Sequence, residues 1–336
     1  MKQKKNIIKL PILVLILLST FSFLNCNNDS YDEEEDETTT SESSIIAESY
    51  FNTSSLISIE LVEARLEDGT TADCYQITFS GDAIDGELGP FCPETIDDIG
   101  GIAVYDGETN PGLRNISRDL LEDMEADGWN IVEDDTGLVY SNNNSGTSNC
   151  LALAYDADLN FVFTVPVVPK LASSSTDIDE VENLGFSIDG TPLTGDPPSA
   201  VFGPAMFGTQ DISEIEEINF PSIDPCGGHP DPAGYYHAHF IPQVINQVLA
   251  ANNIDEVECT MFEQTSGTIL AGFAKDGFPI YAYAEMPDDL DECNGRTAAT
   301  TEYPDGVYHY VASTTAVTNM PPCLKGVAVQ DSFEIQ

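Results

Sequence analysis

The chain has 336 residues, of which 58 are Asp or Glu and 11 are Lys or Arg, so its formal net charge at pH 7 is −47. Repulsion by so much negative charge disfavours nucleic acids and anionic membrane surfaces as partners. Such acidity is explained either by solvation in a salty exterior or by weak binding of divalent cations, and we favour solvation.

The amino terminus is typical of an export signal. Four lysines precede a short apolar run over residues 10–24, which is too short and wrongly flanked for a membrane span. Cys26 follows almost directly, so residues 1–25 are predicted to be a lipoprotein signal peptide, with Cys26 acylated after cleavage. The exported chain would then be anchored by lipid to the bacterial outer membrane or cell surface. Asn25 stands where a small residue is usual, and the alternative is ordinary secretion with Cys26 as one more thiol.

Residues 26–44 are dominated by acidic, hydroxyl and amide side chains, which cannot bury surface. They predict an acidic, disordered tether. A folded body then begins near residue 45. The Pro- and Ser-rich segment 166–176 is the best candidate boundary within it, between an amino-terminal module over residues 45–165 and a histidine-bearing module over residues 177–336.

The body reads mostly as short strands between turns. Helical spacing of apolar residues is confined to about 116–124 and 242–251. Alternating or apolar runs predict three antiparallel pairs: 56–62 with 74–79, 151–155 with 160–166, and two short strands within 273–283. The expected fold class is therefore mainly β with a few short helices, a β-rich α+β fold of antiparallel sheets stapled by disulfides.

Seven cysteines follow Cys26, and in an exported chain most should form disulfides. The preferred pairs each close a modest loop: Cys74 with Cys92, Cys226 with Cys259, and Cys293 with Cys323. Cys150 is left over, and it is either buried and inert or a soft metal ligand.

All four histidines lie in one carboxyl-terminal stretch, inside two diverged copies of one pattern. The first copy is Cys226-Gly-Gly-His229 followed by Gly234-Tyr-Tyr-His-Ala-His239. The second copy is Cys293-Asn-Gly-Arg296 followed by Gly306-Val-Tyr-His-Tyr-Val311. Histidines scattered at random would not cluster in this way, so this stretch is the place to look for a site.

In a strand, alternate side chains point to one face, so His237 and His239 should project together. Neutral imidazoles bind transition metals such as Cu or Zn, and three histidines can leave one coordination position open. His229 and His309 are the expected third and fourth ligands if the two copies pack face to face. The alternative is that the histidines are hydrogen-bonded members of an aromatic core.

Four further residues are expected to line a pocket at this site: Tyr236, Tyr308, Asp276 and Arg296. Arg296 would offer a fixed positive charge to a carboxylate or phosphate, although an internal salt bridge is the simpler expectation on so acidic a chain.

A crowded acidic run, Asp288, Asp289, Asp291 and Glu292, is a secondary expectation for Ca²⁺. It lacks the glycine and the spacing of a recognised calcium loop.

Taken in order, several segments resemble the signature blocks of the YHYH-domain proteins, which are secreted or surface-anchored bacterial proteins. They are the two histidine copies described above, Gly185-Phe-Ser-Ile-Asp-Gly-Thr-Pro192, Gly272-Phe-Ala-Lys-Asp-Gly-Phe-Pro-Ile-Tyr281 and Cys323-Leu-Lys-Gly326. The family's tetrapeptide is altered in both copies, to Tyr236-His-Ala-His239 and Tyr308-His-Tyr-Val311. The resemblance implies a common site and no particular reaction.

Three functions remain open on the sequence. The first is a surface-anchored module that binds Cu or Zn through the histidines. The second is a disulfide-stabilised structural or adhesive surface protein with structural histidines. The third is an enzyme that uses the metal to activate water or oxygen, with an acidic residue such as Asp276 as its base.

Overall fold

The computed structural model describes residues 45–81, 88–142, 144, 146–178, 181–195, 200, 217–317 and 319–336. The predicted signal peptide, Cys26 and the whole of the predicted tether therefore lie outside the described residues. Within the described ranges, no helix is both long and apolar enough to cross a membrane.

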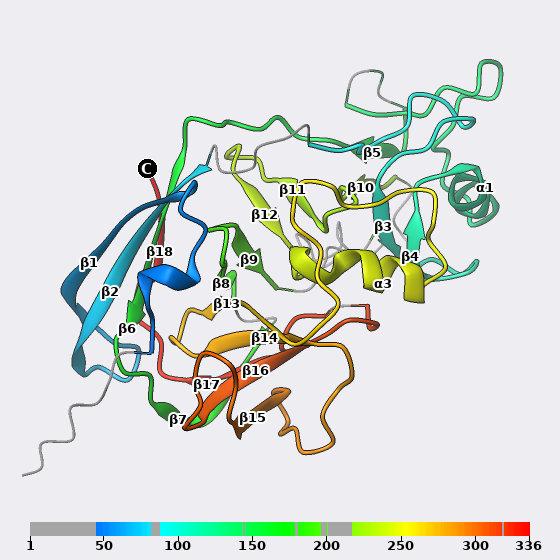
Figure 1. The fold of residues 1–336 in the computed structure, drawn as a ribbon. Helices are drawn as coiled ribbons and strands as arrows, with labels where there is room; N and C mark the ends of the chain where they lie inside the picture. The colour runs from blue at the N-terminus through cyan, green and yellow to red at the C-terminus, as the bar shows by residue number, and fades with distance from the viewer. Residues whose placement is uncertain are drawn as a thin grey trace, which may run out of the picture. The chain divides into compact units, whose positions relative to one another are not determined.

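Strands dominate the fold, and the helical segments are few and short, as predicted (Figure 1). The helical segments are η1 (Glu48–Tyr50), α1 (Arg118–Ala126), η5 (Pro242–Val244) and α3 (Ile245–Ala251). The strands are β1 (Leu56–Arg65), β2 (Thr71–Ser80), β3 (Ile102–Tyr105), β4 (Gly112–Asn115), β5 (Asn149–Leu151), β6 (Asn160–Pro166), β7 (Leu171–Asp177), β8 (Asn183–Ser187), β9 (Pro192–Thr194), β10 (Asn219–Pro221), β11 (Gly228–Pro230), β12 (Tyr236–Ala238), β13 (Ile269–Ala274), β14 (Pro279–Tyr283), β15 (Gly295–Ala298), β16 (Val307–Ser313), β17 (Cys323–Gly326) and β18 (Phe333–Ile335). Most strand pairs are antiparallel, so the predicted fold class is confirmed.

A four-stranded sheet, in the order β1-β2-β6-β18, is built around the predicted pair β1 and β2. The predicted pairing of residues 151–155 with 160–166 is wrong. β5 pairs instead with β10, and β6 lies between β2 and β18. The physical reason is that residues 152–155 form no strand, whereas the apolar run of β6 is buried on both faces along nearly its whole length, as in a central strand.

Aromatic side chains join this sheet to a second, eight-stranded sheet. Phe163 of β6 stacks on Phe186 of β8 with ring centroids 4.5 Å apart, and Phe79 and Phe273 belong to the same buried cluster. Sheets that pack face to face through interdigitating side chains form a core of this kind.

The eight-stranded sheet has the order β11-β12-β9-β8-β13-β14-β16-β15. From its centre outward, each half pairs antiparallel, then parallel, then antiparallel. The sequences of the inner hairpins also match, since Gly185-Phe-Ser-Ile-Asp-Gly-Thr-Pro-Leu193 lies over β8–β9 and Gly272-Phe-Ala-Lys-Asp-Gly-Phe-Pro-Ile280 over β13–β14. The repeat is thus a unit of four strands, and the two histidine-bearing hairpins are its outer ends.

The two histidine copies therefore form opposite edges of one sheet. The expectation that they pack face to face is wrong, because each hairpin extends its own half of the sheet through the parallel pairs β12–β9 and β16–β14.

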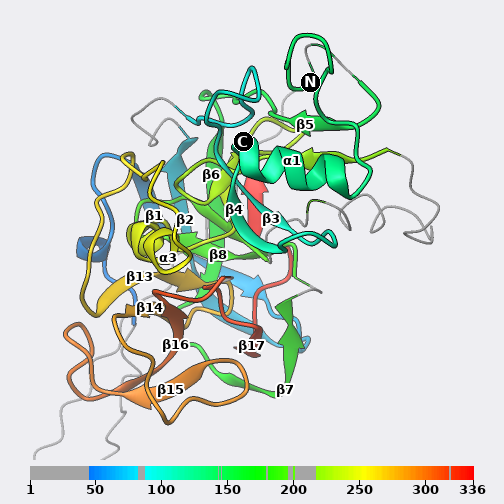
Figure 2. The ribbon, with the colours of Figure 1, turned by 90° about the vertical axis from the view of Figure 1, so that its right-hand side faces the viewer.

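A hairpin of β3 and β4 carries the helix α1 beside it (Figure 2). Leu120, Leu121 and Met124 of α1 are fully buried in one cluster with Tyr105 of β3. The predicted helical segments near 116–124 and 242–251 are confirmed as α1 and as η5 followed by α3.

Strands from the two predicted modules share sheets: β18 pairs with β6, and β10 pairs with β5. Residues Glu42–Gln336 form one compact unit. The division into two modules at residues 166–176 therefore remains a prediction made from the sequence.

Three disulfides link Cys92 to Cys150, Cys226 to Cys259, and Cys293 to Cys323. The last two were predicted, whereas the predicted pair of Cys74 with Cys92 is wrong. Cys74 is a fully buried free cysteine of β2, packed in an apolar cluster with Leu66 and Val329. Because Cys74 is buried in that strand, its thiol does not meet Cys92. Cys150 is bonded to Cys92, so Cys150 has no free thiolate to offer a metal.

Peptide mapping of the exported chain without reduction tests this connectivity. We expect linked peptides for the three bonds, and alkylation of Cys74 only after denaturation, because its side chain is shielded from solvent. Recovery of Cys74 in a disulfide, or of Cys92 as a free thiol in the folded chain, would contradict the assignment.

Candidate metal centre

The first histidine copy folds as a tight hairpin because of its glycines and a buried aspartate. Gly227 has a φ of +87°, and a side chain there would meet Phe240 Cβ at 2.7 Å. A side chain at Gly228 would lie 2.4 Å from the carbonyl oxygen of His237. Asp224 Oδ1 accepts hydrogen bonds from the backbone N–H groups of Cys226 and Gly228, at 2.9 and 3.2 Å. The Cys-Gly-Gly-His segment is therefore what lets β11 approach β12 closely.

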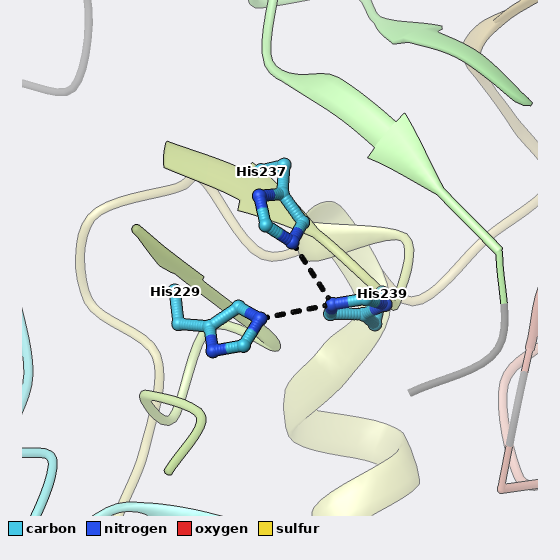
Figure 3. A group of neighbouring side chains, drawn as sticks. All are labelled: His229, His237 and His239. Carbon is cyan, nitrogen blue, oxygen red and sulfur yellow. Dashed lines mark hydrogen bonds between the residues drawn. The ribbon is translucent and has the colours of Figure 1, made fainter. Parts of the chain in front are cut away.

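Three histidines converge on one face of this hairpin (Figure 3). His229 and His237 are direct cross-strand partners in the antiparallel pair β11–β12. His239 follows His237 by two positions, so it projects to the same side, as the alternation of strand residues predicts. The Nε2 atom of His239 lies 3.1 Å from Nε2 of His229 and 3.1 Å from Nε2 of His237. One candidate ligand atom from each residue falls within 4.8 Å of the others.

The hydrogen bond made by His239 determines which of its two ring nitrogens carries the proton and which presents a lone pair to the other two histidines. Its Nδ1 lies 2.9 Å from the carbonyl oxygen of Gly195, which can only accept, so Nδ1 carries the proton. In the neutral ring, Nε2 then offers a single lone pair to two neighbouring imidazoles. Hydrogen bonding alone lets it accept from one of them. A cation shared by the three Nε2 atoms would satisfy all of them together.

Burial keeps the imidazoles of His229 and His237 neutral. His237 and His239 are 6% and 5% exposed. Burial, and then the neighbouring His239, lowers the pKa of His229 to about 3. Burial also lowers the pKa of His237 well below its usual value, and His239 and His229 add to the effect. Neutral imidazole is the form that binds metals, so these two rings are ready to act as ligands at neutral pH.

Comparison with known families identifies the region that carries this group. The sequence model of the family described as YHYH protein matches residues 162–288 and 281–326, which include both histidine copies. The chain is a YHYH-domain protein. Searches of curated proteins and of solved structures found no match.

Tyr235, rather than the predicted Tyr236, lies against the histidines of the YHYH domain. The Tyr235 ring is 5.4 Å from the His237 ring, centroid to centroid. Tyr236 is fully buried and donates a 3.0 Å hydrogen bond to Asp224 Oδ1. Adjacent residues of a strand face opposite ways, so the prediction of Tyr236 was wrong, and the alternation that paired His237 with His239 also indicates Tyr235.

His309 is not part of the triad, and its prediction as a fourth ligand is wrong. It lies on β16, and the strands β9, β8, β13 and β14 separate β16 from β12 in the sheet order. At the usual strand spacing the two hairpins are about 24 Å apart. His309 Nε2 lies 3.0 Å from the Tyr283 hydroxyl, and Nδ1 lies 3.0 Å from the carbonyl oxygen of Val307. Both ring nitrogens therefore have protein partners.

The other predicted pocket residues also have partners outside the triad. Tyr308 donates to Asp291 Oδ2 at 3.0 Å, and Arg296 forms a 3.0 Å ion pair with Asp289, the simpler of its two expected roles. Asp276 is fully buried in the β13–β14 turn. The repeat explains the error, because Tyr308 and Arg296 belong to the far edge of the sheet.

The acidic run expected to bind Ca²⁺ is largely neutralised by basic side chains. Asp289 pairs with Arg296, and Lys325 Nζ lies 3.3 Å from Asp291 Oδ2 and 2.9 Å from Glu292 Oε1. Calcium binding by this run remains a prediction. The ion pairs make it less favourable, because they neutralise carboxylates that would bind the ion.

Proposed function

We propose that the protein is an exported, surface-anchored module whose YHYH domain binds Cu or Zn through His229, His237 and His239. The observation that carries the proposal is the convergence of three Nε2 atoms, with His239 Nε2 at 3.1 Å from both of the others. Two of the three side chains are almost completely buried. Buried polar groups that converge without enough donors among themselves are typical of a site completed by a ligand.

The donor set fits these metals. Zinc is bound by histidine nitrogens at 2.0–2.1 Å in tetrahedral sites, which places ligand nitrogens about 3.4 Å apart. The separations of 3.1 Å are within a few tenths of an ångström of that value. The hydrogen bond from His239 Nδ1 to the Gly195 carbonyl is the outer-shell contact that usually orients a ligating histidine. Three imidazoles leave a coordination position for water or another ligand.

Two features support export and anchoring. The three disulfides are of the kind that form and persist in oxidising compartments. The lysines, apolar run and Cys26 at the amino terminus form the pattern of a lipoprotein signal.

A purely structural role for the histidines is the competing proposal. It is supported by the burial of His237 and His239, but hydrogen bonding lets the single lone pair of His239 Nε2 accept from only one of the two rings that lie 3.1 Å from it. A metal-dependent enzyme is less well supported, because Asp276, the predicted base, is held in a separate turn.

Thermal unfolding of the full chain with added metals tests the proposal. A ligand that binds only the folded state at about 1,000 times its Kd raises the free energy of unfolding by about 4 kcal/mol. We expect Zn²⁺ or Cu²⁺ to raise the unfolding temperature and a chelator to reverse the rise, whereas Mg²⁺ should report only weak binding to the acidic surface. An equal rise with Mg²⁺ and Zn²⁺ would count against a histidine site.

A further inference from the structure

A second concave site lies away from the metal centre. It is a cavity of about 680 Å³ bounded by the η1 region, the β8–β9 turn, η5 and the segment that follows α3. Its volume is in the usual range for small-molecule sites. The lining includes the carboxylates of Asp189, Glu263 and Glu302, and no Lys or Arg occurs among the described lining residues.

The buried side-chain amide of Gln243 lies in the wall of this cavity. Gln243 is only 3% exposed, and its Nε2 donates to Asp189 Oδ2 at 2.6 Å. That bond fixes the orientation of the amide, because a flipped group would place its oxygen against the carboxylate. The Oε1 atom of Gln243 then has no hydrogen-bond partner in the described part of the chain. Because Oε1 is enclosed, the contribution of Gln243 to the cavity is its Nε2 donor, which positions the Asp189 carboxylate.

The negative charge of Asp189 also lacks a cationic partner among the described residues. Its two oxygens accept from neutral amides, Asn52 Nδ2 at 3.1 Å and Gln243 Nε2 at 2.6 Å. These bonds hold the carboxylate in place without neutralising it. A carboxylate fixed by amides is well prepared to meet a cation.

The internal repeat shows that this arrangement differs from its counterpart. Asp189-Gly190 occupies the position in β8–β9 that Asp276-Gly277 occupies in β13–β14. Asp276 is covered by its own half of the sheet, where Tyr310 donates to it. The position equivalent to Tyr310 in the first half is Ala238, which has no hydroxyl. Asp189 is therefore left to face the cavity.

We propose that this cavity binds a small organic amine, with the Asp189 carboxylate, held in place by Gln243 Nε2, receiving its ammonium N–H groups. The aromatic rings of Tyr50 and Phe262 and the apolar side chain of Leu270 also line the cavity. Carboxylates beside aromatic and apolar surface suit a cation with a hydrocarbon body. A bare metal ion would need oxygen ligands on all sides and would fill little of this volume.

Calorimetric titration of the full chain with phenethylamine and with its neutral analogue 2-phenylethanol, in physiological salt, tests the proposal. Spermidine serves as a second amine. We expect the amines to bind, the alcohol to bind about tenfold or more weakly, and Asp189→Asn to remove that preference. Glu263→Gln, at an exposed lining position, is a second variant that should weaken amine binding without threatening the fold. Asp134→Asn, an exposed carboxylate of a turn outside the cavity, is the matched control.

Several outcomes would overturn the proposal. They are equal binding of amine and alcohol, binding that Asp189→Asn and Asp134→Asn change alike, no binding of either amine, and binding of a neutral disaccharide in place of the amines. Binding should persist in the presence of a chelator and in a His237→Ala/His239→Ala chain, so its loss there would tie it to the metal centre instead.

Discussion

Replacing His239 by alanine is expected to weaken Zn²⁺ binding by about 100-fold or more, because changes at the ligands themselves exceed the 10- to 100-fold effects of outer-shell changes. His239 is the central member of the triad, with Nε2 atoms 3.1 Å away on both sides. Its loss removes one ligand and separates the remaining two. His229→Ala should have a smaller effect, since His229 is the most exposed of the three. Competition with a chromophoric chelator gives the three Kd values directly.

The second half of the repeat supplies the matched control. His309 occupies the position of His237, but both of its ring nitrogens are engaged by Tyr283 and Val307. His309→Gln should therefore leave the Kd for Zn²⁺ unchanged. If it weakened binding as much as His239→Ala does, the site would have to involve both edges of the sheet, and the assignment to one hairpin would be wrong.

The buried carboxylate of Asp276 is expected to make stability depend on pH. Burial raises the pKa of Asp276 to about 6, against the opposing effect of hydrogen bonds from Tyr310 and the backbone N–H groups of Phe278 and Gly326. The folded chain thus holds this proton more tightly than the unfolded chain, whose carboxyl titrates near 3.9. The resulting stabilisation is complete below pH 4 and is lost as the pH rises through about 6. The loss amounts to about 3 kcal/mol.

The measurement is the difference in free energy of unfolding between the parent chain and Asp276→Asn at several pH values. Buried neutral histidines impose the opposite dependence over part of this range, but they are present in both chains and cancel in the difference. From pH 4 to pH 6 the parent should lose stability relative to the variant. Asp134→Asn, at an exposed position, should show a difference that does not change. A flat difference for Asp276→Asn would mean that Asp276 has the same pKa in the folded and unfolded chains, and would contradict the account.

The sequence predicted the local features of the site and missed its long-range arrangement. Strand alternation places His237 and His239 together, and the hairpin places His229 opposite His237. The location of His309 depends on the order of strands in an eight-stranded sheet, which local pattern does not specify. Two similar hairpins can meet face to face or lie at opposite edges, and only the parallel pairs β12–β9 and β16–β14 decide between them.

The repeat itself contained a stronger signal than the histidine segments alone. Gly185-Phe-Ser-Ile-Asp-Gly-Thr-Pro192 and Gly272-Phe-Ala-Lys-Asp-Gly-Phe-Pro279 share a glycine, a phenylalanine, an Asp-Gly turn and a proline in register. Comparing them would have extended the repeat to four strands. The Cys92–Cys150 bond had no such signal, because it joins a loop to the short strand β5 across a separation of 58 residues.

The most direct test of the central claim is elemental analysis of the full chain, exported without an affinity histidine tag, beside its His237→Ala/His239→Ala variant. The account predicts close to one Cu or Zn per parent chain and none in a variant that still folds, as judged by its disulfides and unfolding transition. Absence of metal from both chains, even after loading with Cu²⁺ and Zn²⁺, would contradict it and leave the three histidines as structural members of the sheet.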